Sequence, residues 1–360
     1  MNGPIKVLVY PQDNNPYQSL LYGSMENVEI AYARREPRQV GKVLFPLVVL
    51  RHRLAGFRIV HIHWPEFSLP RKLPFHIWLS TAWFYVCVAW IKFVGCRLVW
   101  TVHNVVPHES HTLDDVAAAR YLAARADAKI VHSPHTIAEM EKRGLDVNDT
   151  VVIPHGNYEG MYPDQITREE ARARLGLQKD AFVALFFGNI RTYKGLDDLV
   201  QAFAEVDDVE ARLLVVGRVT EPHALDGVRA AEDPRILLHT GWIDDAEVAM
   251  FFRASDVLCA PFRSVTTSGS VLLALTFGKP LLAPRLGTLR DLPGDVGWLY
   301  EPDEPGSLSA ALRAALDVRE RDVRAAAAAR YAKTLGWPEI SRHTRAVYAD
   351  LVSIGKPRLR

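Results

Sequence analysis

The decapeptide FFGNIRTYKG, residues 186–195, decides how this chain is interpreted. It begins inside an apolar run, residues 182–187, which predicts a buried strand, and Gly188 ends that run. Arg191 and Lys194 follow in a short loop, and the next residues have the apolar spacing of a helix. Amide groups at a helix start, together with two nearby cations, favour a phosphate site. From this segment alone, an ordinary strand-to-helix turn with solvated cations is an equally good interpretation.

A second loop of the same kind lies at residues 261–270, PFRSVTTSGS, between an apolar run and an apolar helical stretch. Hydroxyl groups and a glycine at a helix start offer donors to an anion, although Thr267 or Ser268 could instead cap their own helix. Arg263 adds a third cation to the two of the first loop. Two helix starts and three cations are more than one cap requires, so the pair of loops predicts a diphosphate site.

Length and composition favour an ordinary two-domain globular protein. The chain has 360 residues and a net charge of +1, which gives no support for nucleic-acid binding. Its three cysteines, Cys87, Cys96 and Cys259, show no paired spacing, so we expect a reducing compartment without disulfides or a zinc site. A strand-like run begins at Ile5, so no signal peptide is expected and the protein is expected to be cytoplasmic.

Apolar runs of strand length alternate with helical patterns along the chain, which predicts parallel sheets wrapped by helices in two doubly wound halves. The expected strands are 5–10, 28–32, 59–62, 97–102, 128–132 and 151–153, then 182–187, 211–216, 236–239, 257–260, 280–283 and 297–300. We expect an α/β protein with domains over 1–163 and 164–334 and a helical segment over 335–360. Ligands of such sheets bind beyond the carboxyl ends of the strands, so the crevice between the halves is the expected active site.

The segment from Leu73 to Gly95 is apolar and rich in aromatic residues, and Arg71, Lys72, Lys92 and Arg97 flank it. Its length would suffice to span a bilayer. Three interpretations stay open: a buried or half-buried helix, an interfacial helix with its rings at the lipid headgroups, and a transmembrane span. The transmembrane interpretation fits least well, because the strand-like segments on either side belong to one domain.

With both loops in view, the chain resembles the GT-B glycosyltransferases of the glycogen-synthase-like superfamily, which is glycosyltransferase family 4-like and mostly retaining. The resemblance covers most of the chain and is strongest from about Val183 to Pro302. It rests on FFGNIRTYKGLDDLVQAF, LLVVGR, ASDVLCAPFRS, TSGSVLLALTFGKPLLAP and GWLYEPDEP. It implies two Rossmann-like domains facing across a cleft, with the acceptor on the N-terminal domain and a nucleotide-sugar on the C-terminal one. The final helix is implied to cross back to the N-terminal domain.

The resemblance also implies roles for the two loops, which in this family hold the diphosphate of the nucleotide-sugar. The implied donor-binding residues are Gly188, Asn189, Arg191, Lys194, Arg263, Thr267, Ser268, Gly269 and Ser270. Arg191 and Lys194 count as catalytic, because fixed cations stabilise the departing phosphate. No metal or other cofactor is therefore expected. His61 and His63 have the spacing of a metal pair, but no third ligand is evident.

On the N-terminal side, the run Val99–Val102 ends at His103, which places an imidazole at the carboxyl end of a strand. The family has a histidine or an acid at this point, so we expect His103 in the catalytic centre, hydrogen-bonding a sugar hydroxyl; a structural histidine is the alternative. The expected acceptor contacts are Asn15, Tyr17, His108 and Glu109. If the enzyme inverts, His108 or Glu109 is the candidate base, whereas retention needs no protein base.

The chain departs from the family pattern at three positions. Asn189 stands where many members carry an arginine, and Val265 and Leu273 stand where many carry two glutamates. The second glutamate usually binds the ribose, so the ribose must be held differently here. The TSGS segment is similar to a variant found in bacterial sugar transferases that act on lipid-linked or polysaccharide acceptors.

The sequence therefore predicts a hexosyltransferase that moves a sugar from a UDP- or GDP-linked donor to a hydroxyl of a glycan, glycolipid or lipid-linked acceptor, with retention of configuration. The alternatives are an inverting β-mannosyl-type transferase, a GT-B epimerase and a non-catalytic two-lobed ligand-binding protein. No nucleic-acid partner is expected. Segment 73–95 is the expected point of peripheral contact with the inner face of a membrane.

Overall fold

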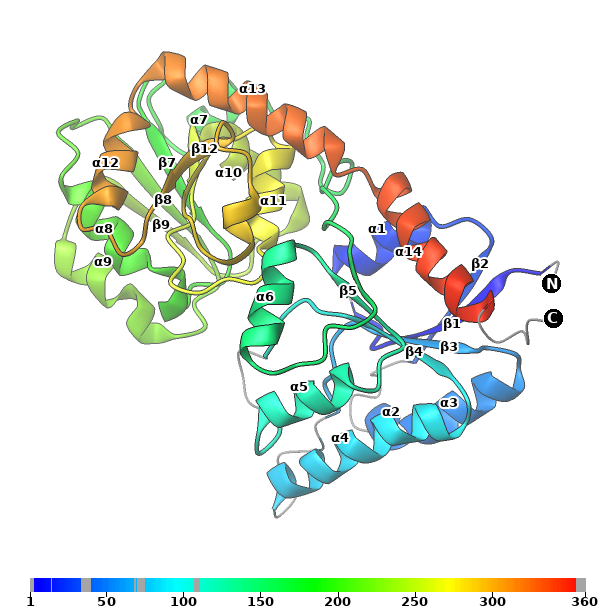
Figure 1. Ribbon diagram of the computed structural model, residues 1–360. Helices are drawn as coiled ribbons and strands as arrows, with labels where there is room; N and C mark the ends of the chain where they lie inside the picture. The colour runs from blue at the N-terminus through cyan, green and yellow to red at the C-terminus, as the bar shows by residue number, and fades with distance from the viewer. Residues whose placement is uncertain are drawn as a thin grey trace. The chain divides into compact units, whose positions relative to one another are not determined.

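The computed structural model describes residues 3–13, 15–33, 40–67, 69, 75–106 and 111–353. The chain divides into two compact units (Figure 1). Unit 1 comprises Met1–Gly156 together with Trp337–Arg360, and unit 2 comprises Asn157–Gly336. The first boundary thus falls after Gly156, earlier than the expected 163, and the last helix belongs to unit 1.

Unit 1 is built on a six-stranded parallel sheet in the order β2-β1-β3-β4-β5-β6. Its strands are β1 (Ile5–Tyr10), β2 (Val28–Tyr32), β3 (Ile59–Ile62), β4 (Arg97–Thr101), β5 (Ala128–Val131) and β6 (Thr150–Val152). Its helices are α1 (Pro16–Gly23), α2 (Val40–Val43), α3 (Phe45–Leu54), α4 (His76–Phe93), α5 (Asp115–Ala123), α6 (Pro134–Lys142) and α14 (Trp337–Ser353). Side chains of β1 alternate between two cores: Leu8 and Tyr10 pack with residues of α3, α4 and α5, and Val7 and Val9 pack with residues of α1 and α14.

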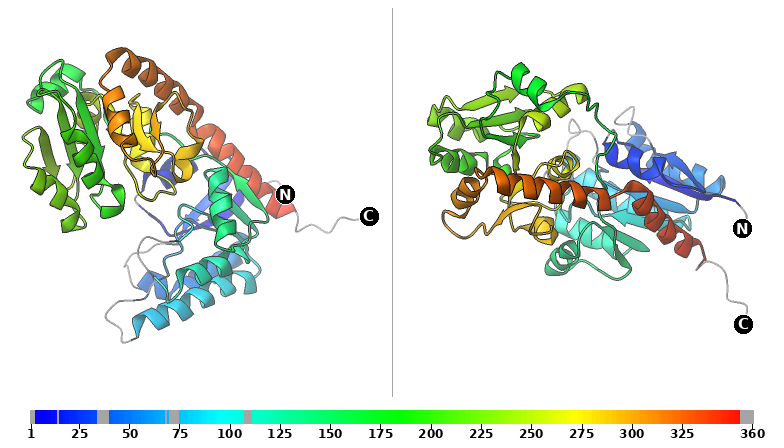
Figure 2. Two further views of the ribbon diagram at one scale, coloured as in Figure 1. Left: turned by 60° about the vertical axis from the view of Figure 1, so that its left-hand side comes forward. Right: turned by 90° about the horizontal axis from the view of Figure 1, so that it is seen from above.

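Unit 2 has a second six-stranded parallel sheet, in the order β12-β11-β10-β7-β8-β9. Its strands are β7 (Val183–Phe187), β8 (Arg212–Gly217), β9 (Ile236–Thr240), β10 (Val257–Cys259), β11 (Leu281–Pro284) and β12 (Gly297–Tyr300). Its α-helices are α7 (Arg168–Arg174), α8 (Leu196–Ala204), α9 (Asp226–Ala231), α10 (Asp245–Ala254), α11 (Gly269–Thr276), α12 (Ser307–Ala314) and α13 (Val318–Thr334); the short 3-10 turns are η1 (Thr192–Lys194), η2 (Pro222–Leu225) and η3 (Gly287–Asp291). Helices α8, α9 and α12 cover one face, and α10 and α11 lie on the other, packed against α7 and α13 (Figures 1 and 2).

The two parallel sheets with alternating helices confirm the predicted α/β class. The buried strands are apolar on both faces because helices cover both sides, which is why they appear in the sequence as continuous apolar runs. The aromatic segment forms α4, which buries Phe84, Cys87, Val88 and Ile91 and leaves its other side exposed. One buried and one exposed side fit both the half-buried and the interfacial interpretations of this segment. Among the helices of the described ranges, none combines the length and apolar character that a bilayer crossing requires.

Candidate active site

The two predicted phosphate loops lie together at the carboxyl edge of the second sheet. Loop 1 (residues 188–195) follows β7, and loop 2 (residues 261–270) follows β10. These strands are neighbours, and the chain continues from β7 towards β9 on one side and from β10 towards β12 on the other. Such a reversal of strand order is the switch point at which open α/β sheets bind ligands. The loops touch directly, since the Arg263 amide donates to the Tyr193 carbonyl at 2.8 Å.

Lys194 of loop 1 is a buried cation with no anion paired to it among the described residues. Lys194 is 9% exposed, and its Nζ lies 5.6 Å from the Phe262 ring centre and 6.0 Å from that of Phe186. No described residue accepts a hydrogen bond from Nζ. Burial, and to a lesser degree the charge of Arg191, lowers the pKa of Lys194 to about 8. Burying an ammonium without a counter-charge is costly, so this position suits a ligand that brings negative charge.

The other residues of loop 1 hold this arrangement. Gly188 has φ of 111°, which favours glycine, and a Cβ at Gly188 would lie 2.8 Å from Lys194 Nζ. Arg191 Nε donates to Thr220 Oγ1 at 3.2 Å, which anchors the guanidinium beside the lysine. Asn189 is exposed. The loop therefore brings Gly188, Arg191 and Lys194 together as expected.

Loop 2 ends at the start of α11, whose first residue is Gly269. Ser268 stands at the N-cap position, but its side chain makes no capping hydrogen bond; its Oγ pairs with Ser270 Oγ at 3.0 Å. The Thr267 hydroxyl oxygen is buried and has no hydrogen-bond partner among the described residues. The self-capping alternative is therefore wrong. An orphaned buried hydroxyl next to uncapped helix amides is a second feature that suits an anionic ligand.

Arg263 has a different place from the one expected. Its guanidinium donates to both carboxylate oxygens of Asp198 (2.9 and 2.8 Å) and to Asp197 Oδ2 (2.7 Å). These hydrogen bonds to Asp198 and Asp197 raise the pKa of Arg263 above its ordinary value. Because two carboxylates already use its donors, Arg263 fastens loop 2 to the first turn of α8 instead of facing a phosphate.

We expect Gly195→Ala to disrupt this junction. Gly195 has φ of +68°, and a Cβ there would lie 2.0 Å from the Pro261 carbonyl oxygen of the other loop. Both strain and overlap oppose the substitution, so we expect about 2–4 kcal/mol of lost stability, or displaced loops. Urea unfolding with Gly160→Ala as the comparison tests this, because Gly160 also has positive φ (+73°) but has open space around it. Equal losses in the two variants would contradict a specific contact between the loops.

In unit 1, strands β3 to β6 bring histidines to the carboxyl edge of the sheet, two from β3 and one from each of the other strands. The histidine cluster consists of His61, His63, His103, His132 and His155, all buried or nearly so. Tyr17 lies among them, with ring-centre distances of 4.7 Å to His103 and 4.9 Å to His155. Burial lowers the pKa of all five, to about 3 for His61 and His155 and about 4 for His132. These rings are therefore neutral at pH 7.

The hydrogen bonds of the cluster fix its tautomers. His132 Nδ1 lies 2.9 Å from the Ile153 carbonyl oxygen, which can only accept, so Nδ1 carries the proton. His132 Nε2 then accepts from His103 Nδ1 (3.4 Å), and His103 Nε2 accepts from His63 Nδ1 (3.2 Å). His63 Nε2 accepts in turn from the Tyr22 hydroxyl (2.7 Å). A single direction of donation thus runs from Tyr22 to Ile153.

This arrangement changes the expectations for His103 and Tyr17 on the N-terminal side, and it leaves that for Asn15 untested. His103 is buried, is stacked on Trp64 at 4.6 Å and has both ring nitrogens next to other imidazoles, so the expected hydrogen bond to a sugar hydroxyl is not available in this arrangement. Tyr17 is 2% exposed inside the cluster, so it is not a surface contact for an acceptor. Asn15 is exposed and caps α1, because its Oδ1 accepts from the Tyr17 amide at 3.0 Å. His108 and Glu109 lie outside the described residues.

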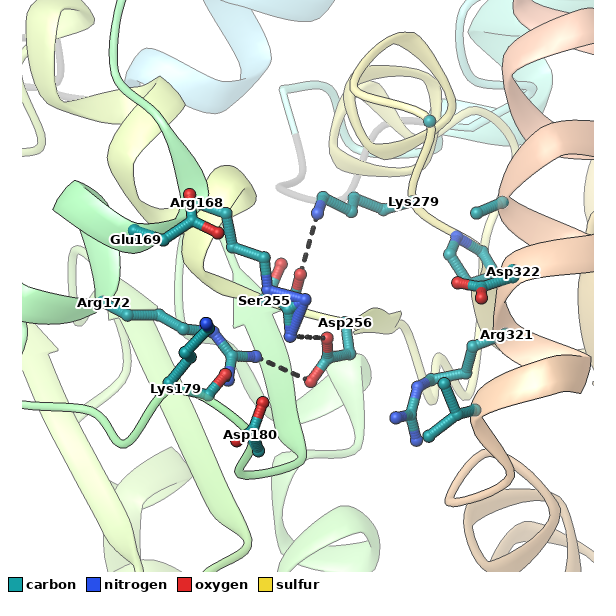
Figure 3. Close-up of a pocket in the computed structure, with 14 residues that line it drawn as sticks. Arg168, Glu169, Arg172, Lys179, Asp180, Ser255, Asp256, Lys279, Arg321 and Asp322 are labelled. Atoms are coloured by element: carbon teal, nitrogen blue, oxygen red, sulfur yellow. Dashed lines mark hydrogen bonds and ion pairs between the residues drawn. The ribbon is translucent and has the colours of Figure 1, made fainter.

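A cavity of about 320 Å³ in unit 2 lies at the opposite, amino edge of the sheet (Figure 3). Its charged side chains largely satisfy one another: Asp256 accepts from Arg168 (2.7 Å) and Arg172 (2.9 Å), and Lys279 donates to the Ser255 carbonyl (2.8 Å). These bonds fasten α7 and the turn before β11 to the sheet, and the cavity is not part of the loop site. Within the described ranges, no group of three or more His, Cys, Asp or Glu is placed to hold a metal ion.

Sequence reasoning missed His63, His132 and His155 as members of one cluster. The available signal was that each of them lies at or just after the end of a predicted strand, as His103 does, and parallel strands end at one edge. It also missed Tyr158, whose hydroxyl lies against the helix start of loop 2: a Cβ on Gly269 would be 3.1 Å from it. No local pattern predicts that contact.

Comparison with known proteins gives the loop site its context. A family model described as "Glycosyl transferases group 1" matches residues 181–317, which include both loops. A D-inositol 3-phosphate glycosyltransferase of Thermomonospora curvata is 31% identical over 294 residues, which cover 73% of this chain and 67% of that protein. A GDP-mannose:glycolipid 4-beta-D-mannosyltransferase of Xanthomonas campestris is 26% identical over 273 residues, covering 72% of this chain and 70% of that protein.

Solved structures share the fold. Sucrose-phosphate synthase of Thermosynechococcus elongatus has a TM-score of 0.75 at 17% identity, covering 98% of this chain and all of that one. HepE of Anabaena, solved in complex with UDP-glucose, has a TM-score of 0.73 at 17% identity, covering 97% and 99% of the two chains. The expected GT-B fold is thereby confirmed. The expected glycosyltransferase enzyme is confirmed by the relatives of the chain. This chain belongs to the group 1 glycosyltransferases.

Proposed function

We propose that the enzyme transfers a hexose from a UDP- or GDP-linked sugar whose diphosphate lies at the switch point of unit 2. Lys194 and Arg191 would face the phosphate oxygens, and Thr267 with the first amides of α11 would supply further donors. The observation that carries this proposal is the Lys194 ammonium, which is buried and lacks an acceptor among the described residues. The orphaned Thr267 hydroxyl supports it independently.

The chemistry follows from where charge develops. Breaking the bond between the sugar and the diphosphate leaves negative charge on the phosphate oxygens, and a fixed cation in a poorly solvated site stabilises that charge more than water does. Lys194 is already desolvated before the donor binds, so little reorganisation is needed when the bond breaks. His103 would act indirectly, by setting the position of Trp64 at the carboxyl edge of the first sheet.

For the acceptor we propose a glycan, glycolipid or lipid-linked sugar. The name of the Xanthomonas relative favours GDP-mannose and a glycolipid as the first pair to test. The same name also supports the inverting alternative, since a β-mannoside formed from GDP-α-mannose requires inversion. The chain carries Val265 and Leu273 where retaining members carry glutamates, which agrees with a departure from the retaining pattern.

A donor panel tests the proposal. We expect GDP-mannose or a UDP-hexose at about 100 times its Kd to stabilise the full chain by about 2.7 kcal/mol, because only the folded state binds it. Thermal shift with GDP-mannose, UDP-glucose and UDP-galactose ranks the donors, and the anomeric proton of the product in NMR distinguishes retention from inversion. An equal response of a Lys194→Met variant would show that the ligand binds elsewhere.

A further inference from the structure

Helix α4 turns an uncharged apolar side away from its own core. Its exposed positions recur at helical spacing: Phe75 just before the helix, then Trp78, Leu79, Ala82, Val86, Ala89 and Phe93. Trp78 is 63% and Phe93 79% exposed. A surface helix of a globular protein normally carries charged or polar residues on this side. The outward side of α4 is therefore built for an apolar environment.

Helix α3 lies beside α4 and continues the same surface. The Trp83 and Trp90 indole groups of α4 donate to the carbonyls of Lys42 in α2 (3.0 Å) and Pro46 in α3 (2.8 Å), which fixes these helices in one layer (Figures 1 and 2). The exposed residues of α3 also recur at helical spacing, at Leu47, Arg51 and Leu54, and Val43 and Leu44 are exposed just before the helix. We call the exposed apolar residues of both helices, with Phe75, Val43 and Leu44, the α3–α4 face.

The charge of this layer has one sign. Residues 40–58 and 75–95 contain no Asp or Glu, and their cations are Lys42, Arg51, Arg53, Arg58 and Lys92. Lys92 is paired with Asp127 on the sheet side, whereas Arg51 is exposed among the leucines of α3. Apolar and aromatic groups combined with basic residues complement an anionic lipid surface, where rings sit at the headgroup level and cations meet lipid phosphates.

We propose that the α3–α4 face docks on an anionic lipid bilayer, with α4 lying in the plane of the headgroups. The inference rests on the proposed function in that it gives the enzyme a lipid surface on which a glycolipid acceptor is found. A second copy of the chain could also cover an apolar face, but segments 40–58 and 75–95 contain no acid that would pair with the exposed Arg51 of that copy.

Vesicle co-sedimentation of the full chain tests the proposal. We expect binding to vesicles of phosphatidylcholine with about one-third phosphatidylglycerol, weaker binding to pure phosphatidylcholine, and a decrease with salt. The double variant Trp78→Glu/Phe93→Glu should bind at least about tenfold more weakly, because two exposed apolar anchors become acidic. Val323→Glu, at a 65% exposed helical position of unit 2, is the matched control and should bind as the wild type does.

Two results would overturn the proposal: a wild type that stays in the supernatant with anionic vesicles, or a double variant that sediments as the wild type does. If the wild type is a dimer that does not bind vesicles, and the double variant is a monomer, the face would be assigned to self-association instead. Both altered residues are exposed, so folding should persist, and circular dichroism checks this. A thermal shift with GDP-mannose measures the donor site separately, so failure of lipid docking is distinguishable from failure of the proposed function.

Discussion

Replacing Lys194 with methionine lowers kcat/KM by on the order of 10²–10³-fold while leaving the protein at least as stable as before; this is the largest effect on activity that we expect. The variant removes the buried ammonium and keeps a side chain of similar length. The loss corresponds to about 3–4 kcal/mol of transition-state stabilisation, as is typical when one charge-stabilising group is removed. Steady-state kinetics with saturating acceptor measures it.

The expectation that Lys194→Met is at least as stable as the wild type follows from the sign of the pKa shift of Lys194. Burial lowers the pKa of Lys194 from its ordinary value to about 8, so the charged form is disfavoured in the folded chain. Below pH 8 the unfolded and folded states are both protonated, and the desolvation cost, about 3 kcal/mol as an order of magnitude, is fully present. Methionine removes that cost. We therefore expect an unchanged or higher melting temperature without ligand, and a loss of the donor-induced shift.

The pH dependence of donor binding gives a further check. The wild type should bind its donor less tightly as pH rises above about 8, since Lys194 loses its proton there, and Lys194→Met should lack this dependence. Lys279→Met is the matched control: burial also lowers the pKa of Lys279 to about 8, but this lysine lies at the opposite edge of the same sheet. Similar kinetic losses in both variants would contradict a specific role for Lys194.

The loop site was predictable from sequence because its parts are local. An apolar run, a glycine, two cations and a helix occur within residues 183–204, and the parallel topology places the second such loop beside the first. The role of Arg263 was not predictable, because its partners Asp197 and Asp198 are about 65 residues away in the chain. A basic side chain in a phosphate loop looks the same in sequence whether or not a carboxylate already holds it.

The N-terminal side was harder for a related reason. Each histidine of the cluster was visible in or just after a predicted strand, but their mutual contacts depend on the register of four strands. Tyr17 follows a polar loop and so resembled a surface residue, whereas α1 turns it into the cluster. Helix α4 is apolar on every side, so its sequence predicts a helix but not which side packs against the sheet.

The histidine cluster leads to the second large effect: unit 1 should lose stability steeply below about pH 6.5, before unit 2 does. In the unfolded chain these histidines titrate near 6.5, whereas in the folded unit the pKa values of His61, His132 and His155 are about 3, 4 and 3. Between these limits the unfolded state binds more protons, so stability is present above pH 6.5 and falls with decreasing pH. Three histidines give a slope of about 4 kcal/mol per pH unit, a large share of a typical folding free energy.

The hydrogen-bond order explains why the folded unit resists protonation. Each ring between Tyr22 and Ile153 donates from Nδ1 and accepts at Nε2. An imidazolium has two donors and no acceptor, so protonating His103 would set its Nε2–H against the Nδ1–H of His63. The folded unit therefore excludes the proton until it opens as a whole.

Hydrogen exchange of the full chain from pH 8 to pH 4.5, corrected for the intrinsic rate, resolves the two units. We expect the protection of β4 amides to fall below pH 6 while that of β8 amides persists. His155→Gln keeps a side-chain donor for the Gly156 carbonyl but cannot titrate, so it should reduce the slope by up to about 1.4 kcal/mol per pH unit, even if it lowers stability at pH 8. Parallel loss of protection in β4 and β8, or an unchanged slope in this variant, would show that the buried histidines do not set the acid limit of the fold.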